Sequence, residues 1–181
     1  MKKKYLLFVL FAISNVAVWG QVSIKIDRII LDNVIEAKDT DLYISHWGGG
    51  PSVTMCVSIT NTSHDEIKIC RHEDYELYCT YEYEGTTHKT VDIYLSIDEN
   101  HPLVILPDST YNESFSTNLY LPFNVMEQSD IVIYDHSLVL NEVMSSFKMI
   151  LHFGGRKYVS NSNPVITKGD SFYNEHKWEV N

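Results

Sequence analysis

Apolar and polar residues alternate with a period of two along most of the chain, which is typical of strands with one buried face. The first alternating run begins at Val22 and closes on the apolar residues 29–31. In a later run, every second residue from Tyr75 to Tyr83 is apolar or aromatic. The alternation predicts strands over 22–31, 53–60, 66–70, 75–84, 87–95, 103–106, 115–119, 147–153 and 156–160.

Turn residues separate these runs at short intervals. Glu84-Gly85 and Gly154-Gly155 each lie between two alternating runs and predict β-hairpins. Short strands that are rich in Val, Ile, Tyr and Thr and punctuated by turns predict an all-β fold, an antiparallel β-sandwich. Helical spacing is found only at 137–146, and this short window fits a strand almost as well.

Two short segments resemble a pattern common in secreted bacterial Ig-like modules. In the segment 57–63 a strand ends in Thr-Asn-Thr-Ser, and the segment 105–109 reads Ile-Leu-Pro-Asp-Ser. The modules end a later strand in Leu-x-Pro-Gly-x-Ser, so Asp108 stands where glycine is usual. The resemblance implies an Ig-like sandwich and implies no reaction. The antibody-type signature is absent, because no tryptophan lies between any two of the cysteines.

The first twenty residues have the composition of a signal peptide. Three lysines follow Met1, and a largely apolar stretch runs over 5–18. Val18 and Gly20 are small enough for the −3 and −1 positions of a signal peptidase site, so the exported chain is expected to begin at Gln21. The alternative is a membrane anchor, but the apolar stretch is shorter than the roughly 20 residues that span a bilayer. We therefore expect a signal peptide at 1–20, a sandwich domain at 21–167 and a polar tail at 168–181, exported to the periplasm or the exterior.

The negative net charge of the chain disfavours some classes of binding partner. The chain has a formal net charge of −10, and its first twenty residues hold three lysines and no acid, which leaves −13 on the remainder. An acidic surface repels phosphate, which disfavours nucleic acids and anionic lipid as partners. The hydrophobic content of 44% is ample for a folded core.

The most unusual stretch is the glycine-rich segment 46–52. Glycine permits a close approach of backbone to a ligand, and Trp47 offers a stacking surface, so His46, Trp47, Gly48 and Gly49 form a candidate binding loop for a sugar or a peptide. The alternative is a flexible connection into the next strand, with Trp47 packed on the edge of the sandwich.

The densest polar clusters are 64–66 and 70–74, which contain histidine, cysteine and carboxylates. These side chains are zinc ligands, but their spacing matches no established metal motif. The chain also lacks a Gly-x-Ser-x-Gly nucleophile elbow. We therefore expect no metal, no cofactor and no enzymatic activity.

The cysteines give a prediction based on strand register. If 53–60 and 66–70 form a hairpin, pairing Thr60 with Glu66 places the apolar residues on one face and Cys56 opposite Cys70 on the other. An exported compartment favours a Cys56–Cys70 disulfide in that register, with Cys79 as a buried free thiol. The alternatives are a Cys70–Cys79 bridge, or no bridge if the strands cross between the two sheets.

These observations predict an exported, non-catalytic binding or structural protein of the bacterial envelope. The expected partner is another envelope protein or a glycan. Two other functions stay open, a secreted peptidase inhibitor and a hydrolase with an unrecognised site.

Overall fold

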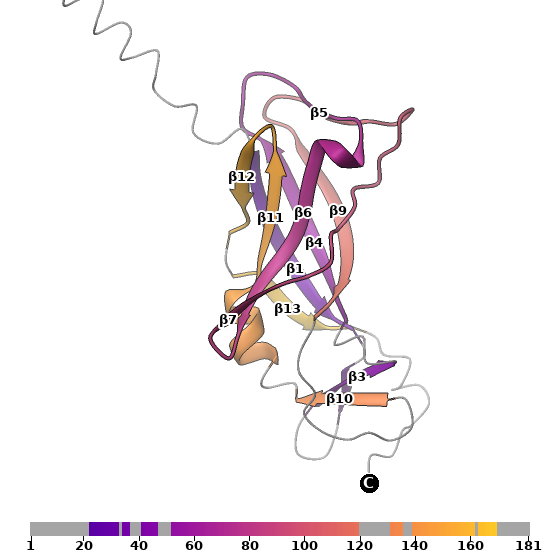
Figure 1. Ribbon diagram of the computed structural model, residues 1–181, viewed down its shortest axis with the longest axis vertical. Coiled ribbons are helices and arrows are strands. Elements are labelled where there is room, and N and C mark those ends of the chain that lie inside the picture. The colour runs from indigo at the N-terminus through magenta and orange to yellow at the C-terminus, as the bar shows by residue number, and fades with distance from the viewer. Residues whose placement is uncertain are drawn as a thin grey trace, which may run out of the picture.

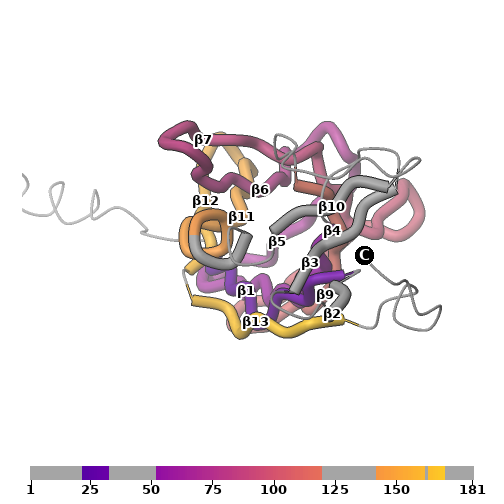
Figure 2. Tube along the Cα trace, turned by 90° about the horizontal axis from the view of Figure 1, so that it is seen from below, coloured from indigo at the N-terminus to yellow at the C-terminus, as the bar shows by residue number. Residues whose placement is uncertain are grey.

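Two four-stranded sheets face each other (Figure 1). The computed structural model describes residues 22–32, 34–36, 41–46, 52–119, 131–135, 139–161 and 163–169, with the backbone alone at 34–36, 41–46, 131–135 and 139–141. The first sheet has the order β13 (Val165–Lys168), β1 (Val22–Leu31), β4 (Ser52–Asn61) and β9 (Thr110–Asn118). The second has the order β12 (Arg156–Val159), β11 (Lys148–Phe153), β6 (Tyr75–Tyr83) and β7 (Thr86–Lys89). Figure 2 shows β6 and β7 on one side of the molecule and β1 and β13 on the other, so the predicted all-β sandwich is confirmed.

Smaller elements complete the described chain. A two-stranded ribbon joins β5 (Ile67–Ile69) to β8 (Leu103–Ile105), and a three-stranded sheet has the order β10 (Ile131–Asp135), β3 (Asp41–His46) and β2 (Val34–Glu36). A 3-10 turn, η1 (His72–Asp74), precedes β6, and the ambiguous window at 137–146 contains a short π-helical segment, η2 (Val139–Met144). In the part of the chain that the structure describes, no helix is long and apolar enough to cross a membrane.

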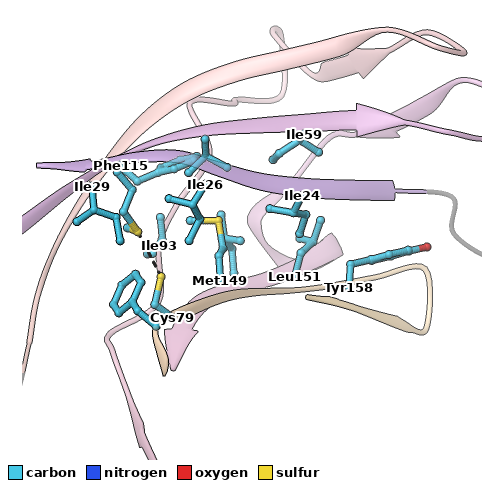
Figure 3. Packing of buried hydrophobic residues seen from close by; sticks show 14 of the residues in the cluster. Ile24, Ile26, Ile29, Ile59, Cys79, Ile93, Phe115, Met149, Leu151 and Tyr158 are labelled. Carbon is cyan, nitrogen blue, oxygen red and sulfur yellow. Dashed lines mark hydrogen bonds between the residues drawn. The ribbon is translucent and has the colours of Figure 1, made fainter. Parts of the chain in front are cut away.

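The core lies between the two sheets and is formed by the inward positions of the alternating strands. Figure 3 shows Ile24, Ile26 and Phe115 of the first sheet facing Met149 and Leu151 of the second. The alternation of buried and exposed residues in β1 shifts by one position after Ile26, because β1 has a bulge there against β4. Ile26 lies opposite Val57, and Arg28, two residues later, lies opposite Cys56. This bulge keeps the residues on both sides of it, Ile26 and Ile29, in the core.

The glycine-containing hairpins form as predicted. Glu84 and Gly85, between β6 and β7, have φ of 48° and 72°, and Gly154 and Gly155, between β11 and β12, have φ of 58° and 72°. Two successive residues with positive φ make the tight turn whose twist matches that of antiparallel strands. The one parallel pair among the described strands is β1 with β13, a strand that the alternation did not predict.

The predicted hairpin between 53–60 and 66–70 is wrong. β4 is an inner strand, paired with β1 on one side and β9 on the other, so neither of its edges is free for β5. β5 pairs with β8 instead, in the register Ile67 opposite Ile105. The register that placed Cys56 opposite Cys70 therefore does not exist, and all three cysteines are free thiols in the structure.

Residues 90–97 form an extended connection that we call the strap. Only its first part follows β6, through hydrogen bonds from the Thr90 amide to the Cys79 carbonyl (2.9 Å) and from the Ile93 amide to the Leu77 carbonyl (2.7 Å). The predicted strand over 87–95 is thus shorter, since β7 ends at Lys89. Beyond Ile93 the strap is bonded to β6 through the Tyr75 side chain, and it crosses toward β9, where the Ser96 hydroxyl donates to the Glu113 carboxylate.

Candidate binding site at one end of the sandwich

Two polar loop regions lie at the end of the sandwich where β4 ends and β6 begins (Figure 1). The first is the junction between the Asn61 loop and the turn after β8. The Asn61 amide nitrogen donates to the carbonyls of Asp65 (2.8 Å) and Ile105 (2.9 Å). The Asn61 side-chain oxygen accepts from the Ser63 amide (2.9 Å) and the Ser63 hydroxyl (2.7 Å). Asn61 is fully buried, so these bonds hold the loops together and leave no side-chain atom of Asn61 for a ligand.

Backbone bonds close the same junction. The Asn61 amide donates to the Ser109 carbonyl and the Asp108 amide donates to the Asn61 carbonyl, each at 3.0 Å. The two segments that resemble secreted Ig-like modules therefore meet here, although they are far apart in the sequence. Asp108, which replaces the usual glycine, has a φ of 56°.

The second region is formed by η1 and the strap, and Tyr75 anchors one to the other. The Tyr75 hydroxyl accepts the Leu95 backbone N–H at 2.7 Å and lies 3.0 Å from Nδ1 of His72. The exposed ring of Tyr94 contacts the His72 ring edge to face, with 5.1 Å between the centroids. Burial, together with the nearby charge of Glu113, raises the pKa of Tyr75. The hydroxyl therefore stays protonated and can keep both contacts at neutral pH.

Two adjoining pockets open on this region. The larger pocket has a volume of about 470 Å³ and is lined by Cys70, Arg71, His72, Glu73, Asp74, Ile97, Asp98 and Glu99. The smaller pocket has a volume of about 270 Å³ and is lined by His72, Glu73, Tyr75, Glu76, Leu77, Asp92, Ile93 and Tyr94. His72 and Glu73 belong to both linings. We call the two pockets together the end site.

Local bonds fix several carboxylates of the end site. Asp74 accepts the backbone N–H groups of Cys70 (3.2 Å) and Arg71 (3.0 Å), which holds the loop before β6 in place. The Asp98 carboxylate accepts the amides of Asn100 (2.7 Å) and His101 (2.8 Å) and contacts the His101 ring. These bonds, that to His101 first, lower the pKa of Asp98. The rim of the larger pocket thus carries negative charge at neutral pH.

The predicted binding loop cannot be compared with this site. Trp47, Gly48 and Gly49 lie outside the described residues. His46 is the last residue of β3 and pairs with Ile131, and its side chain is not described.

The cysteines occupy three different surroundings. Cys56 lies on the outer face of the first sheet, with its sulfur 3.7 Å from Nη2 of Arg28. Cys70 lines the larger pocket, and its amide donates to Asp74. Cys79 is buried in the core beside the Met55 sulfur, and burial raises the pKa of its thiol. The predicted disulfide fails because Cys56 and Cys70 belong to strands and loops that never pair.

The polar clusters 64–66 and 70–74 do not converge on a metal site. Among the described residues, no group of three or more His, Cys, Asp or Glu side chains has the arrangement to hold a metal ion. The cluster at 70–74 instead lines the larger pocket. Its partners in the end site, Tyr94 and the residues 97–99, were not singled out in the sequence, where Tyr94 is one polar-facing position in an alternating run.

Comparisons with known proteins give no family. No protein-family model matches the chain. No curated protein matches it either. Among solved structures, it resembles an uncharacterized β-sandwich protein from Clostridium difficile 630, with 15% sequence identity and a TM-score of 0.25 over 78% of this chain and 80% of that chain.

Proposed function

We propose that the chain is an exported protein of the bacterial envelope that acts by binding, through the end site. The observation that carries this proposal is the pair of adjoining pockets, which share His72 and Glu73, together with the exposed ring of Tyr94 that contacts His72. Exposed aromatic side chains beside polar groups are enriched where proteins bind partners. Export is supported by the composition of residues 1–20, and the bacterial envelope by the resemblance of 57–63 and 105–109 to secreted Ig-like modules.

The walls of the end site are held by the core, which favours binding without rearrangement. Tyr75, Leu77 and Ile93, which line the smaller pocket, are buried members of the hydrophobic core. The bond from the Leu95 amide to Tyr75 fixes the strap above them. A site that is already ordered loses little conformational entropy when a partner binds.

The experiment is a map of binding by NMR. Uniformly 15N-labelled protein is titrated with two sets of probes, defined neutral oligosaccharides and short synthetic peptides of differing charge. We expect the shifted amides to lie in 70–76 and 92–99, and Tyr94→Ala to abolish those shifts. Val159→Ala is the matched control, because Val159 is an exposed apolar residue on a different edge. Shifts that gather elsewhere, or no shifts with either set, contradict the proposal.

A second function, peptidase inhibition, is favoured by the turn at 98–101. This turn is highly exposed, yet the Asp98 and His101 backbones bond each other in both directions, at 3.3 and 3.1 Å. The Asp98 side chain adds the bonds to Asn100 and His101 described above. A rigid exposed turn suits an enzyme cleft, because little order is lost on docking. Inhibition of one member of a panel of secreted peptidases, lost in Asp98→Ala, supports this function, and the absence of inhibition across the panel contradicts it.

A further inference from the structure

The smaller pocket has the size of a side chain and the lining of an amphipathic one. Its volume of about 270 Å³ is below the roughly 300–1,000 Å³ of pockets that hold whole small ligands. Leu77 and Ile93 supply an apolar floor, and the rings of Tyr75 and Tyr94 stand beside it. Such a pocket fits a long side chain with an apolar stem and a polar tip.

Its rim indicates which polar tip fits. Glu73, Glu76 and Asp92 contribute carboxylates, and no Lys or Arg is among the residues that line the smaller pocket. Aromatic faces attract cations, and carboxylates do so more strongly. The combination favours an ammonium or a guanidinium group.

The chain itself provides a cation in this arrangement at the edge of the pocket. Lys89 places its Nζ 3.9 Å from the centre of the Tyr78 ring, 2.7 Å from Glu76 and 3.2 Å from Asp92. Glu76 and Asp92 also line the pocket, so Lys89 already pairs with two of its three carboxylates. Glu73 carries no such bond among the described contacts and belongs to both pockets, which leaves it as the acceptor for an incoming cation.

We infer that the end site binds a basic segment of a partner protein, with one Arg or Lys side chain entering the smaller pocket. This inference rests on the proposed function and names its ligand class. The flanking residues of the segment lie along the larger pocket, whose lining holds four carboxylates against the single guanidinium of Arg71. The net charge of −10 attracts such a segment over a longer range and makes its association depend on salt.

The test compares two peptides that differ only in charge. The probe is a capped Gly-Ser-Arg-Ser-Gly peptide, and its control carries citrulline, which has nearly the same shape without the charge, in place of arginine. We expect the arginine peptide to shift the amides of 72–77 and 92–95 and the citrulline peptide to bind about tenfold more weakly. Raising the salt concentration lowers the affinity of the arginine peptide and leaves that of the citrulline peptide unchanged.

Variants locate the contact. Glu73→Gln and Tyr94→Ala each reduce the affinity for the arginine peptide about fivefold or more. Glu66→Gln, a matched loss of an exposed carboxylate outside both pockets, leaves the affinity unchanged. Unchanged thermal unfolding in all three variants shows that the fold is intact.

Different failures have different meanings. Equal affinity for the two peptides overturns the inference, because charge is then not recognised. A neutral oligosaccharide that shifts 70–76 and 92–99 while the arginine peptide does not also overturns it, although the proposed function stands. If neither class of probe shifts these residues, both the inference and the proposed function fail.

Discussion

The Asn61 junction and the end site are neighbouring loop regions, but they use polar side chains in opposite ways. At the junction, Asn61 is fully buried and makes four side-chain hydrogen bonds within the chain. At the end site, Glu73, Glu99 and the ring of Tyr94 face the pockets and the solvent. Buried polar atoms must find partners when the chain folds, whereas exposed ones stay available for a ligand. A dense polar motif in the sequence can therefore serve either stability or binding, and burial distinguishes the two.

The sharpest way to break this comparison is Asn61→Ala. The substitution removes four side-chain hydrogen bonds, including the buried bond to the Ile105 carbonyl, and leaves the Asp65 carbonyl with the Ser63 hydroxyl as its donor, so we expect a loss of about 3 kcal/mol in the free energy of unfolding. The melting temperature falls by roughly 6–12 °C for a chain of this size. Calorimetry measures both quantities.

The matched control for that variant is Asn112→Ala. Asn112 is exposed on β9 and accepts one hydrogen bond, from the Ser58 hydroxyl at 2.8 Å. We expect its loss to cost about 0.5 kcal/mol or less. If both asparagine variants are equally stable, the junction is not the structural centre that the contacts indicate.

The second substitution, Tyr75→Phe, tests how the end site is tied to the core. It removes the acceptor of the Leu95 backbone N–H and leaves that amide unpaired in a buried position, at a cost of about 1–2 kcal/mol. Hydrogen exchange at the Leu95 amide should accelerate more than exchange at amides in β4. Tyr83→Phe is the control, because the only hydrogen bond of the Tyr83 hydroxyl within the described part of the chain is a long one of 3.4 Å, to Glu84. Unchanged protection at Leu95 would falsify the anchoring role of Tyr75.

The alternation of apolar and polar residues predicts where long strands lie, but not which strands pair. The long strands β1, β4, β6 and β11 are predicted because a buried face repeats every second residue over many residues. Of β9, only the part from residue 115 is predicted, because residues 110–114 are exposed or half-buried. The pairing of β5 with β8 could not be predicted in this way, because three-residue strands fit many registers. The strap is predicted as part of a strand because Ile93 and Leu95 alternate with polar residues as strand residues do. In the described structure only two backbone hydrogen bonds join the strap to β6.

The sequence pointed to only one of the two walls of the end site. The polar cluster at 70–74 stood out, but its other wall comes from the strap and the 97–99 segment. Nothing local in the sequence states that these segments meet, because their contact depends on the crossing of the strap between the two sheets. The Asn61 junction was more visible, because the resemblance covered both of its halves, although it did not show that they touch.

The third prediction concerns how stability depends on pH at the contact that joins the strap to β9. The Tyr111 hydroxyl donates to the Glu113 carboxylate at 2.6 Å, and Ser96 of the strap donates to the same carboxylate. Burial, then the bond to Glu113 and its charge, raise the pKa of Tyr111 above the ordinary value of 10.0. A raised pKa contributes stability that is complete below pH 10 and is lost as the pH rises toward the folded-state value.

We therefore expect Tyr111→Phe to reduce the slope with which the free energy of unfolding falls above pH 10. The reduction is at most the slope that one titrating proton contributes. Urea unfolding from pH 8 to pH 11 measures the slope. Tyr94→Phe, a substitution of an exposed tyrosine outside this contact, should leave the slope as in the unmodified chain. Equal slopes in all three proteins would show that Tyr111 titrates as it does in the unfolded chain.

The smallest expected effect, and the only gain, comes from Asp108→Gly in the Asn61 junction. Asp108 is the third residue of the turn closed by the bond from the Ser109 amide to the Leu106 carbonyl, and its φ of 56° lies where side chains other than that of glycine are strained. Glycine removes the strain but adds freedom to the unfolded chain, so the net gain is about 0.5 kcal/mol, or roughly 1–2 °C in melting temperature. The bond from the residue 108 amide to the Asn61 carbonyl persists, because it uses the backbone alone. Asp108→Ala supplies the opposite case, since alanine tolerates positive φ less well than aspartate and should lower the melting temperature. A glycine variant less stable than the alanine variant would mean that the Asp108 side chain, and not its backbone, supports the junction.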